Sequence, residues 1–248
     1  MADSPSSESI AVIVPTLNEV ENVEPLVREI MQSVPECGEI IIVDDNSTDG
    51  TPARVRALAP EFPVRLLARE NPTLGLAGAV IAGARAAQAS MLVVMDADLS
   101  HPPSEIKNLI APLVQGRADM VIGSRYVKGG STPGWPIYRR IMSRAAGAMA
   151  YPLTGVHDSM GGFFAIRRAL LLEIAPAATG FKIAFEAIVR GGRGLRVVEV
   201  PIAFRDRARG ASKMNLRVAL LFATRWLAAV LSVIFRRRAV RAPERRTE

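Results

Sequence analysis

Residues 91–103 read MLVVMDADLSHPP, an apolar run that passes directly into acidic and polar residues. The same order occurs at 10–19 (IAVIVPTLNE) and at 40–50 (IIIVDDNSTDG). Short apolar runs that end at polar turn residues are typical of strands buried on both faces of a sheet. We therefore predict five strands, at residues 10–14, 40–43, 64–67, 91–95 and 120–122.

Amphipathic segments separate these runs and predict helices at residues 19–33, 49–59, 76–88 and 103–114. Strands that alternate with helices indicate an α/β fold, a doubly wound and mostly parallel sheet flanked by helices. After Gly123 the pattern changes to a glycine-rich loop, followed by mixed short elements up to Phe204. Because neither an internal repeat nor a linker divides the chain, we expect one catalytic domain at residues 10–213.

Composition supports a sizeable core, because 49% of the 248 residues are hydrophobic. Cys37 is the single cysteine, which excludes an intramolecular disulfide and favours a reducing compartment. Residues 1–9 lack the apolar stretch of a signal peptide, so we expect a disordered leader. The net charge of +7 comes from residues 205–248, which hold 12 Lys and Arg against 3 Asp and Glu.

Acidic residues follow the strands at the edge where open α/β sheets bind ligands. Asp96 and Asp98 are one residue apart, and their mutual repulsion favours a divalent cation, Mg²⁺ or Mn²⁺, that also binds diphosphate oxygens. The alternative is a solvated turn whose aspartate caps the next helix. In the following stretch, DDNSTDGT (44–51), Thr48 or Asp49 can cap a helix while the first two aspartates accept hydrogen bonds from a base or ribose.

Two common nucleotide-binding classes do not fit this sequence. A dinucleotide-binding dehydrogenase needs a glycine-rich turn after its first strand, and PTLNE (15–19) contains no glycine. The P-loop pattern GxxxxGK[ST] is also absent. Nucleic acid is an unfavoured partner, because no aromatic platform or groove-reading motif accompanies the C-terminal arginines.

Eight motifs, taken in order, resemble family 2 glycosyltransferases of GT-A fold, in particular the dolichol-phosphate and polyprenyl-phosphate mannosyltransferases. They are VPTLNEVENV (14–23), VDDNSTDGT (43–51), LGLAGA (74–79), MDADLSHPP (95–103), GSRYVKGG (123–130), HDSMGGFFAIRR (157–168), GFKIAFE (180–186) and VPIAFRDRARGASK (200–213). The resemblance covers roughly residues 10–215. DADLSHPP, GSRYxxGG and FRDRxxGxSK are its most selective parts.

The resemblance implies a set of site residues. The nucleotide-sugar site would comprise Pro15, Leu17, Glu19, Val43, Asp44, Asp45, Ser47, Asp96, Ala97 and Lys213. The metal would be held by Asp96, Asp98 and Ser100, and the lipid phosphate by Arg125, Arg139, Ser143 and Arg207. The residues expected to act directly in catalysis are Asp96, Asp98, Arg125 and Arg207. Ser100 stands where relatives often have Gln, which leaves room for a water on the metal, and Leu17 stands where an aromatic is usual.

The implied reaction transfers mannose from GDP-mannose to dolichyl or polyprenyl phosphate with inversion. A lipid phosphate is already an oxyanion at neutral pH, so it needs positioning and charge compensation more than a general base. Alternatives are a UDP-glucose-dependent polyprenyl-phosphate glucosyltransferase and a non-catalytic, membrane-associated nucleotide-sugar binder. Arg139, Arg140 and Arg144 could also form a solvated helix face, and Arg207 and Lys213 a surface loop.

Two segments suggest contact with a membrane. Residues 216–235 are long enough to span one, but their polar residues share one arc of a helix, and an arginine at mid-span is costly. We favour a helix that lies in the interface, so that 214–248 form an amphipathic interfacial helix and a basic tail. Residues 135–151 have the same mixed character. We expect a peripheral protein on the cytoplasmic face of a membrane, with a separate membrane-anchoring subunit as a further possible partner.

Overall fold

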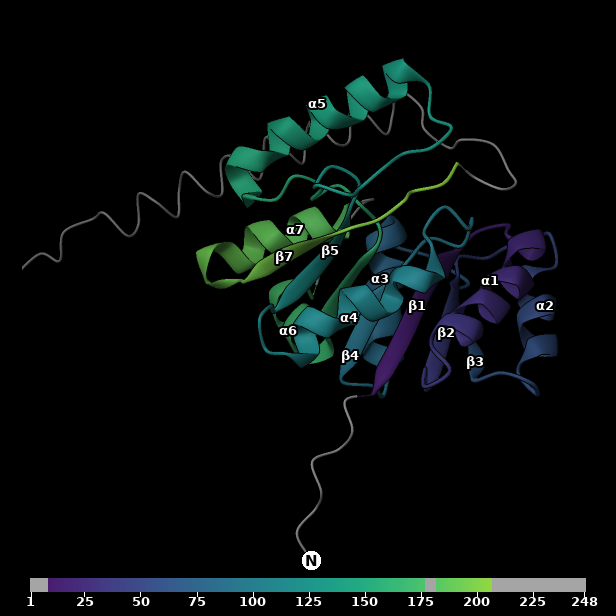
Figure 1. Ribbon diagram of the computed structural model, residues 1–248. Helices are drawn as coiled ribbons and strands as arrows, with labels where there is room; N and C mark the ends of the chain where they lie inside the picture. Colours follow the sequence, from purple (N-terminus) through teal and green to yellow (C-terminus); the bar gives the residue numbers. More distant parts are fainter. Residues whose placement is uncertain (1–8, 177–181, 207–248) are drawn as a thin grey trace, which may run out of the picture.

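A computed structural model describes residues 9–176 and 182–206 of the chain. These form a seven-stranded sheet of order β3-β2-β1-β4-β6-β5-β7 (Figure 1). The strands are β1 (Ile10–Thr16), β2 (Glu39–Asp44), β3 (Val64–Ala68), β4 (Met91–Val94), β5 (Met120–Ser124), β6 (Phe164–Arg167) and β7 (Val197–Pro201). Only β6 runs antiparallel to its neighbours, β4 and β5. The predicted mostly parallel sheet is thus confirmed.

Helices cover both faces of this sheet. They are α1 (Val20–Ser33), α2 (Thr51–Leu58), α3 (Gly75–Ala86), α4 (Ile106–Val114), α5 (Ile137–Thr154), α6 (Arg168–Ile174) and α7 (Ile183–Gly191), with short 3₁₀ helices at Pro103–Glu105 and Gly192–Gly194. Buried side chains of α1, α2 and α4 pack with alternate strand residues on one face. Those of α3, α6 and α7 pack on the other face. All five predicted strands and all four predicted helices are present, with ends shifted by up to three residues.

The reversed strand β6 is the feature that the alternating pattern did not predict. Its residues Phe164, Ala165 and Ile166 lie opposite both β4 and β5 and are fully buried. A reversed strand brings the loop that precedes it, residues 156–163, to the same edge as the carboxyl ends of β4 and β5. This loop therefore becomes part of the edge where ligands are expected.

Helix α5 lies beyond the carboxyl ends of the strands, next to α7 (Figure 1). Its Ala150 is buried against Met160 and Phe185. Its other side leaves large apolar side chains in solvent, including Ile137 at 76% exposed, Ile141 at 62% and Met142 at 63%. No helix in the described ranges has the length and apolar character needed to cross a membrane. Residues 1–8 of the expected leader at 1–9, and the expected interfacial helix and tail at 214–248, lie outside those ranges.

Candidate active site

The loops that follow β1 and β2 are fastened to each other by side chains. The backbone N–H of Asn18 donates to Ser47 Oγ at 2.8 Å, and Asn18 Oδ1 accepts from the N–H of Thr48 at 2.9 Å. Asp49 accepts from Val20 and Thr51, the first residues of α1 and α2, at 3.0 and 2.9 Å. Its predicted capping contact is therefore present, although Gly50, with φ of 95°, is the residue at the cap of α2.

Asp44 ends β2 and is almost fully buried. Its carboxylate accepts hydrogen bonds from the Ser47 N–H at 2.9 Å, the Ser47 hydroxyl at 2.5 Å and the Thr16 hydroxyl at 3.1 Å. Asp45 forms an ion pair of 2.9 Å with Arg69. Burial raises the pKa of Asp45, and the nearby Arg69 opposes that rise. Asp44 is therefore buried and stabilises the loop through its hydrogen bonds, whereas Asp45 is the more exposed of the two.

The loop after β4 carries the other acidic pair. Asp98 Oδ1 accepts from the Ser100 hydroxyl at 2.6 Å and from the Ser100 N–H at 3.1 Å. Between these two residues, Leu99 has a left-handed backbone with φ of 61°. A non-glycine residue in that region costs free energy, and such residues cluster at functional sites. Asn18 and Asn46, in the loops after β1 and β2, share this conformation.

Asp96 is held between a histidine and a glycine. Its N–H donates to Nδ1 of His101 at 3.0 Å, and burial lowers the pKa of that histidine. A Cβ atom on Gly162 would lie 3.1 and 3.3 Å from the two carboxylate oxygens of Asp96. The Asp96 carboxylate therefore packs closely against Gly162 on one side. Its side chain is 38% exposed, so the carboxylate remains accessible to solvent.

This pair fits a divalent ion of the Mg²⁺ type. The described ranges contain no group of three or more His, Cys, Asp or Glu side chains placed to hold a metal. Mg²⁺ retains several waters and takes one or two carboxylates plus substrate phosphates rather than an all-protein cage. Asp96 and Asp98 match that donor set. Ser100 donates its hydroxyl to Asp98 in this structure, and its role as a direct ligand stays a prediction.

The two acidic loops share one edge of the sheet. Strand β1 pairs with β2 on one side and with β4 on the other, all three in parallel. Two strand spacings amount to about 10 Å. Asp44 ends β2 and Asp96 follows β4, so the two residues lie at the ends of strands whose separation a nucleoside diphosphate can bridge. Of the predicted nucleotide-side residues, Val43 and Ala97 are buried, while Leu17 is 42% exposed.

Arg125 follows β5 and is bound to a carboxylate that sequence reasoning did not single out. Its N–H, Nε and Nη2 donate to Asp158 at 2.9, 2.8 and 2.6 Å. Asp158 is fully buried. Burial alone lowers the pKa of Arg125, but the hydrogen bond and charge of Asp158 outweigh it and raise that pKa. Arg125 is therefore a fixed, permanently charged group.

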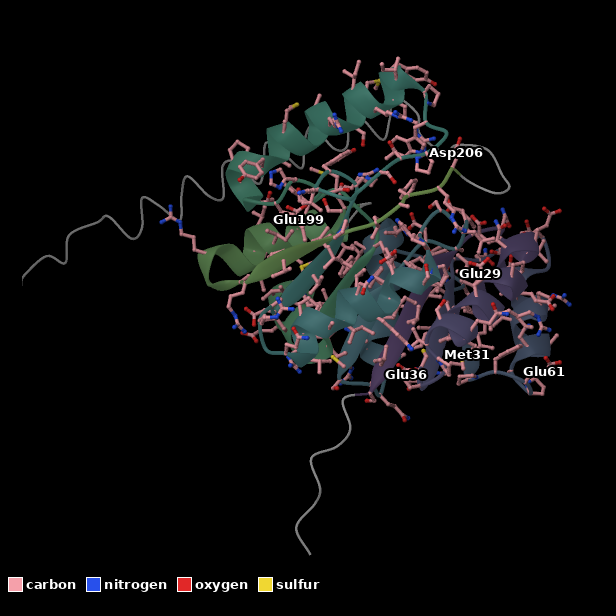
Figure 2. The ribbon with its side chains drawn as sticks, viewed as in Figure 1. Glu29, Met31, Glu36, Glu61, Glu199 and Asp206 are labelled. Atoms are coloured by element: carbon pink, nitrogen blue, oxygen red, sulfur yellow. The ribbon has the colours of Figure 1, made fainter. Side chains whose placement is uncertain are left out.

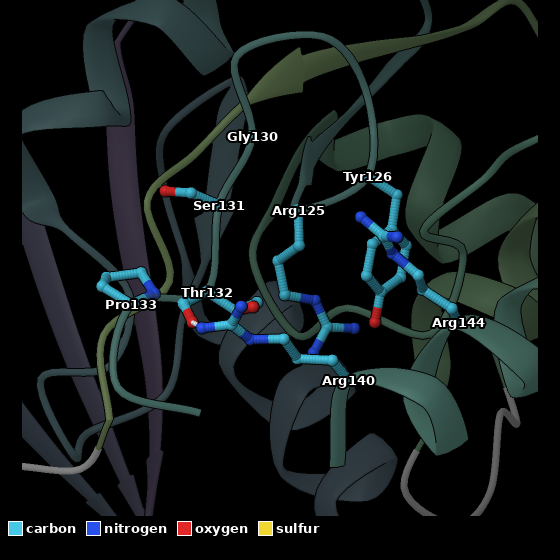
Figure 3. Close-up of a pocket in the computed structure, with 8 residues that line it drawn as sticks. All are labelled: Arg125, Tyr126, Gly130, Ser131, Thr132, Pro133, Arg140 and Arg144. Atoms are coloured by element: carbon cyan, nitrogen blue, oxygen red, sulfur yellow. Dashed lines mark hydrogen bonds between the residues drawn. The ribbon is translucent and has the colours of Figure 1, made fainter. Parts of the chain in front are cut away.

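A cavity of about 300 Å³ opens beside Arg125 (Figure 3). Arg125 projects into it between Arg140 on one side and Tyr126 with Arg144 on the other. The remaining lining residues are Gly130, Ser131, Thr132 and Pro133. Arg140 donates to the Thr132 carbonyl at 3.1 Å, which fixes its guanidinium at the rim. Three arginines around one cavity create a strong preference for an anion with several oxygens.

Of the other residues predicted to bind the lipid phosphate, those that the structure describes do not line the cavity in the way that Arg125 does. Arg139 pairs with Asp206 at 2.9 Å and stacks over the Trp135 ring at 3.8 Å, outside the lining of the cavity. Ser143 accepts a hydrogen bond from the Tyr126 hydroxyl at the cavity wall. Arg140 and Arg144, which the sequence left as a possible solvated face, are exposed and also line the cavity. Arg207 and Lys213 lie outside the described residues.

Comparisons with known proteins agree with these observations. Residues 11–175 match the family described as "Glycosyl transferase family 2". A dolichol-phosphate mannosyltransferase of Pyrococcus furiosus is 41% identical over 211 residues, which cover 83% of this chain and 59% of that protein. The protein of the same name from Saccharomyces cerevisiae is 39% identical over 225 residues, 86% of this chain and 83% of that protein. Polyprenol monophosphomannose synthase of Mycolicibacterium smegmatis is 38% identical over 231 residues, 87% and 85% of the two chains.

Solved structures agree on the fold. Glucosyl-3-phosphoglycerate synthase from Mycobacterium tuberculosis, in complex with Mn²⁺, UDP-glucose and glycerol 3-phosphate, superposes with a TM-score of 0.68 at 22% identity. The match covers 92% of this chain and 80% of that one. At this identity the likeness shows the GT-A architecture alone. Together with the acidic loops of β2 and β4, these matches show that the chain belongs to glycosyl transferase family 2.

Proposed function

We propose that this chain transfers mannose from GDP-mannose to dolichyl or polyprenyl phosphate, with inversion, to give a β-linked lipid phosphate sugar. The observation that carries the proposal is the arginine-lined cavity at the same sheet edge as the acidic loops. A transferase that joins a nucleotide sugar to a phosphate needs two anion sites side by side. The names of relatives at 38–41% identity support mannose and a polyprenyl phosphate as the substrates.

The donor lies across the ends of β1, β2 and β4 in this proposal. The residues assigned to it are Pro15, Leu17, Glu19, Val43, Asp44, Asp45, Ser47, Asp96, Ala97 and Lys213. Asp44 and Ser47 hold the loop that faces the nucleoside, and the exposed Leu17 side chain is available to cover the base. Asp45 accepts from the base or ribose, and its ion pair with Arg69 restrains its position.

The diphosphate lies beside Asp96 and Asp98, the residues that would hold Mg²⁺ or Mn²⁺. When bound, such an ion neutralises the charge that builds on the departing nucleoside diphosphate. The protein supplies two oriented carboxylates for it, one open to solvent and one held by Ser100. The presence of Mn²⁺ with UDP-glucose in the M. tuberculosis structure supports a divalent ion as the cofactor.

The acceptor phosphate enters the cavity beside Arg125. Guanidinium groups bind phosphate oxygens in pairs and compensate the charge of the attacking oxyanion. Direct attack of a phosphate oxygen on the anomeric carbon then expels the diphosphate and inverts that centre, without a covalent enzyme intermediate. Arg125, Arg139, Ser143 and Arg207 are the residues assigned to the acceptor by resemblance. The cavity lining favours adding Arg140 and Arg144 to this set.

The lipid tail lies along α5 in this proposal. Ile137, Ile141 and Met142 are each more than 60% exposed on a helix that also presents Arg140 and Arg144 at the cavity. Exposed apolar side chains next to cationic ones are typical of helices that lie in a membrane interface. We therefore place the protein peripherally on the cytoplasmic face of a membrane, with residues 216–235 as a second interfacial segment. A separate membrane-anchoring subunit is compatible with this arrangement.

A transfer assay tests the proposal. Purified protein is incubated with Mg²⁺ or Mn²⁺, a short polyprenyl phosphate in detergent and a panel of labelled nucleotide sugars. We expect label from GDP-mannose in the lipid, and its loss in Asp98→Ala. Transfer from UDP-glucose alone favours the glucosyltransferase alternative. No transfer from any donor, with nucleotide sugar still bound, favours a non-catalytic binder and overturns the proposal.

A further inference from the structure

We infer that Glu199 is a positioning residue for the acceptor phosphate, which acts by holding Asp158 so that Asp158 fixes the guanidinium of Arg125. The inference rests on the proposed function, in which Arg125 faces that phosphate. Neither Glu199 nor Asp158 belongs to the residues that the motifs assigned to the site.

Glu199 is a charged residue in a largely buried position of a β-strand. It lies in the middle of the edge strand β7, opposite Ile122 of β5 (Figure 2). Its neighbours Val198 and Val200 pack against the core under α1 and α4. Because side chains alternate along a strand, Glu199 points to the opposite face. Its side chain is only 10% exposed, and a carboxylate this buried is costly unless hydrogen bonds satisfy it.

Within the described ranges, the side-chain hydrogen bonds of Glu199 go to the loop that precedes the reversed strand β6. Oε2 accepts from the His157 N–H at 2.9 Å and contacts His157 Nδ1 at 2.8 Å. Oε1 accepts from the N–H of Asp158 at 3.0 Å. One carboxylate thus holds two consecutive backbone amides, with one oxygen on each. This arrangement fixes the two peptide units that flank His157, the second of which leads into Asp158.

Asp158 passes this constraint on to Arg125. Its own carboxylate accepts from the backbone N–H, Nε and Nη2 of Arg125. Contacts to Nε and Nη2 together fix the plane of a guanidinium, because the group is rigid and planar. The rings of Tyr126, Trp135 and Phe204 lie 5.1–5.4 Å from its central carbon and oppose rotation out of that plane.

The other terminal nitrogen of Arg125, Nη1, is available to a ligand in this geometry. Within the described ranges Nη1 donates no hydrogen bond, and Arg125 lines the cavity. If the Asp158 backbone shifts, the guanidinium plane shifts with it. Glu199 therefore controls the angle at which Arg125 meets a phosphate, although it does not line the cavity itself.

The test compares Glu199→Gln with a matched control, Glu39→Gln. Glu39 is also a strand glutamate of low exposure, 17%, and both its oxygens accept the backbone N–H of Gln88, at 3.1 and 3.2 Å. It lies at the amino edge of the sheet, away from the cavity. In either variant one carboxylate oxygen becomes an NH₂ donor, which cannot accept from a backbone N–H. In Glu39→Gln the remaining oxygen still accepts the single Gln88 N–H, whereas Glu199→Gln leaves one of two backbone N–H groups without its acceptor. Glu39→Gln therefore controls for the loss of charge at a strand glutamate of low exposure.

Binding of geranylgeranyl phosphate is measured by calorimetry, and KM is measured separately for polyprenyl phosphate and nucleotide sugar. We expect Glu199→Gln to weaken prenyl-phosphate binding roughly 5- to 20-fold, with KM for the nucleotide sugar changed less than about twofold. Glu39→Gln should leave both constants unchanged. Equal kinetic effects in the two variants would mean a merely structural role and overturn the inference.

A double-mutant cycle with Arg125→Lys tests the route through Arg125. Lysine keeps the charge but lacks the fork that Asp158 orients. Glu199→Gln should then add less than about a further twofold loss of binding in the Arg125→Lys background. Full additivity would show that Glu199 does not act through Arg125 and overturn the inference.

Two further outcomes keep this inference separate from the proposed function. If Glu199→Gln does not fold, Glu199→Asp, which keeps the charge but withdraws it by one methylene, takes its place in the same cycle. Wild-type protein that binds geranylgeranyl phosphate but transfers no sugar overturns the proposed function, while the binding data still decide the role of Glu199. Wild-type protein that does not bind this phosphate overturns the inference.

Discussion

The hydroxyl of Ser100 donates to Oδ1 of Asp98 at 2.6 Å, and the N–H of the same serine donates to the same oxygen at 3.1 Å. Ser100 is fully buried. If its hydroxyl is removed, water cannot take its place beside Asp98 unless the loop rearranges. Groups that orient a metal ligand typically contribute about 10- to 100-fold in metal affinity or activity. We expect Ser100→Ala to raise the metal concentration for half-maximal activity by roughly tenfold or more.

Titration of activity with Mn²⁺ and with Mg²⁺ measures this effect. Ser90→Ala is the matched control, because Ser90 is an exposed serine that precedes the same strand at its amino end. An unchanged metal requirement in Ser100→Ala would show that Asp98 is oriented without the hydroxyl. Ser100→Thr keeps the hydroxyl and should retain most of the metal affinity if it folds.

Gly162 sets the position of Asp96 by the absence of a side chain. A Cβ atom there would lie 3.1 Å from one Asp96 oxygen, 3.3 Å from the other and 3.3 Å from His101. We expect Gly162→Ala to displace the carboxylate by a few tenths of an ångström and lower kcat about tenfold, because misplaced catalytic groups lose rate steeply. Gly194→Ala, which places its Cβ in open space, is the control. Equal kcat in both variants would contradict this account.

His101 makes stability depend on pH in a definite direction. Burial lowers its pKa below the ordinary value of 6.5, while the nearby Asp96 and Asp98 oppose that shift. As pH falls through 6.5, the unfolded chain binds a proton that the folded chain does not. The free energy of unfolding therefore decreases as the pH falls below 6.5, by at most about 1.4 kcal/mol per pH unit from this histidine. The decrease stops once the pH falls below the pKa of His101 in the folded protein.

Urea unfolding between pH 5 and pH 8 tests this prediction. The free energy of unfolding of wild-type protein should fall more steeply below pH 6.5 than that of His101→Gln. His157→Gln, which replaces the other histidine of the chain, controls for the loss of an imidazole. Parallel pH profiles for wild type and His101→Gln would show that His101 titrates normally in the folded state.

The fold was predictable because its signals are local. Each apolar run at 10–14, 40–43 and 91–95 ends in polar residues, and a parallel sheet brings all such ends to one edge. The acidic loops were predictable for the same reason. The reversed strand β6 was not, because Phe164, Ala165 and Ile166 are buried whichever way the strand runs, and burial alone carries no direction.

The Arg125–Asp158–Glu199 network was hidden for a different reason. Its members are separated by 33 and 41 residues, and only the pairing of β5 with β6 and β7 brings them together. The sole sequence signal was a glutamate inside an apolar run, VVEVP (197–201). The sequence also did not predict the orientation of α5 about its own axis. Adjacent residues such as Arg139 and Arg140 lie about 100° apart on a helix, and only the packing of α5 against the domain determines which of them faces the cavity.

The orientation of α5 about its own axis leads to a prediction about the acceptor site. Arg140 and Arg144 are four residues apart, share one side of α5 and line the cavity with Arg125, whereas Arg139 pairs with Asp206. Charge-assisted hydrogen bonds to a phosphate contribute about 1.5–3 kcal/mol each. We therefore expect the double variant Arg140→Gln, Arg144→Gln to raise KM for polyprenyl phosphate at least tenfold, with KM for the nucleotide sugar nearly unchanged.

Three comparisons make this prediction specific. The control double variant Arg56→Gln, Arg117→Gln removes two charges from exposed residues on α2 and after α4, away from the cavity, and should leave both KM values unchanged. Arg139→Gln alone tests the residue that the motifs favoured. If it raises KM for the lipid while the Arg140, Arg144 variant does not, the phosphate binds on the Trp135 side of α5, because Arg139 stacks on that ring. If only the Arg140, Arg144 variant is impaired, the cavity is the acceptor site and the contact between Arg139 and Asp206 serves to hold α5 in place.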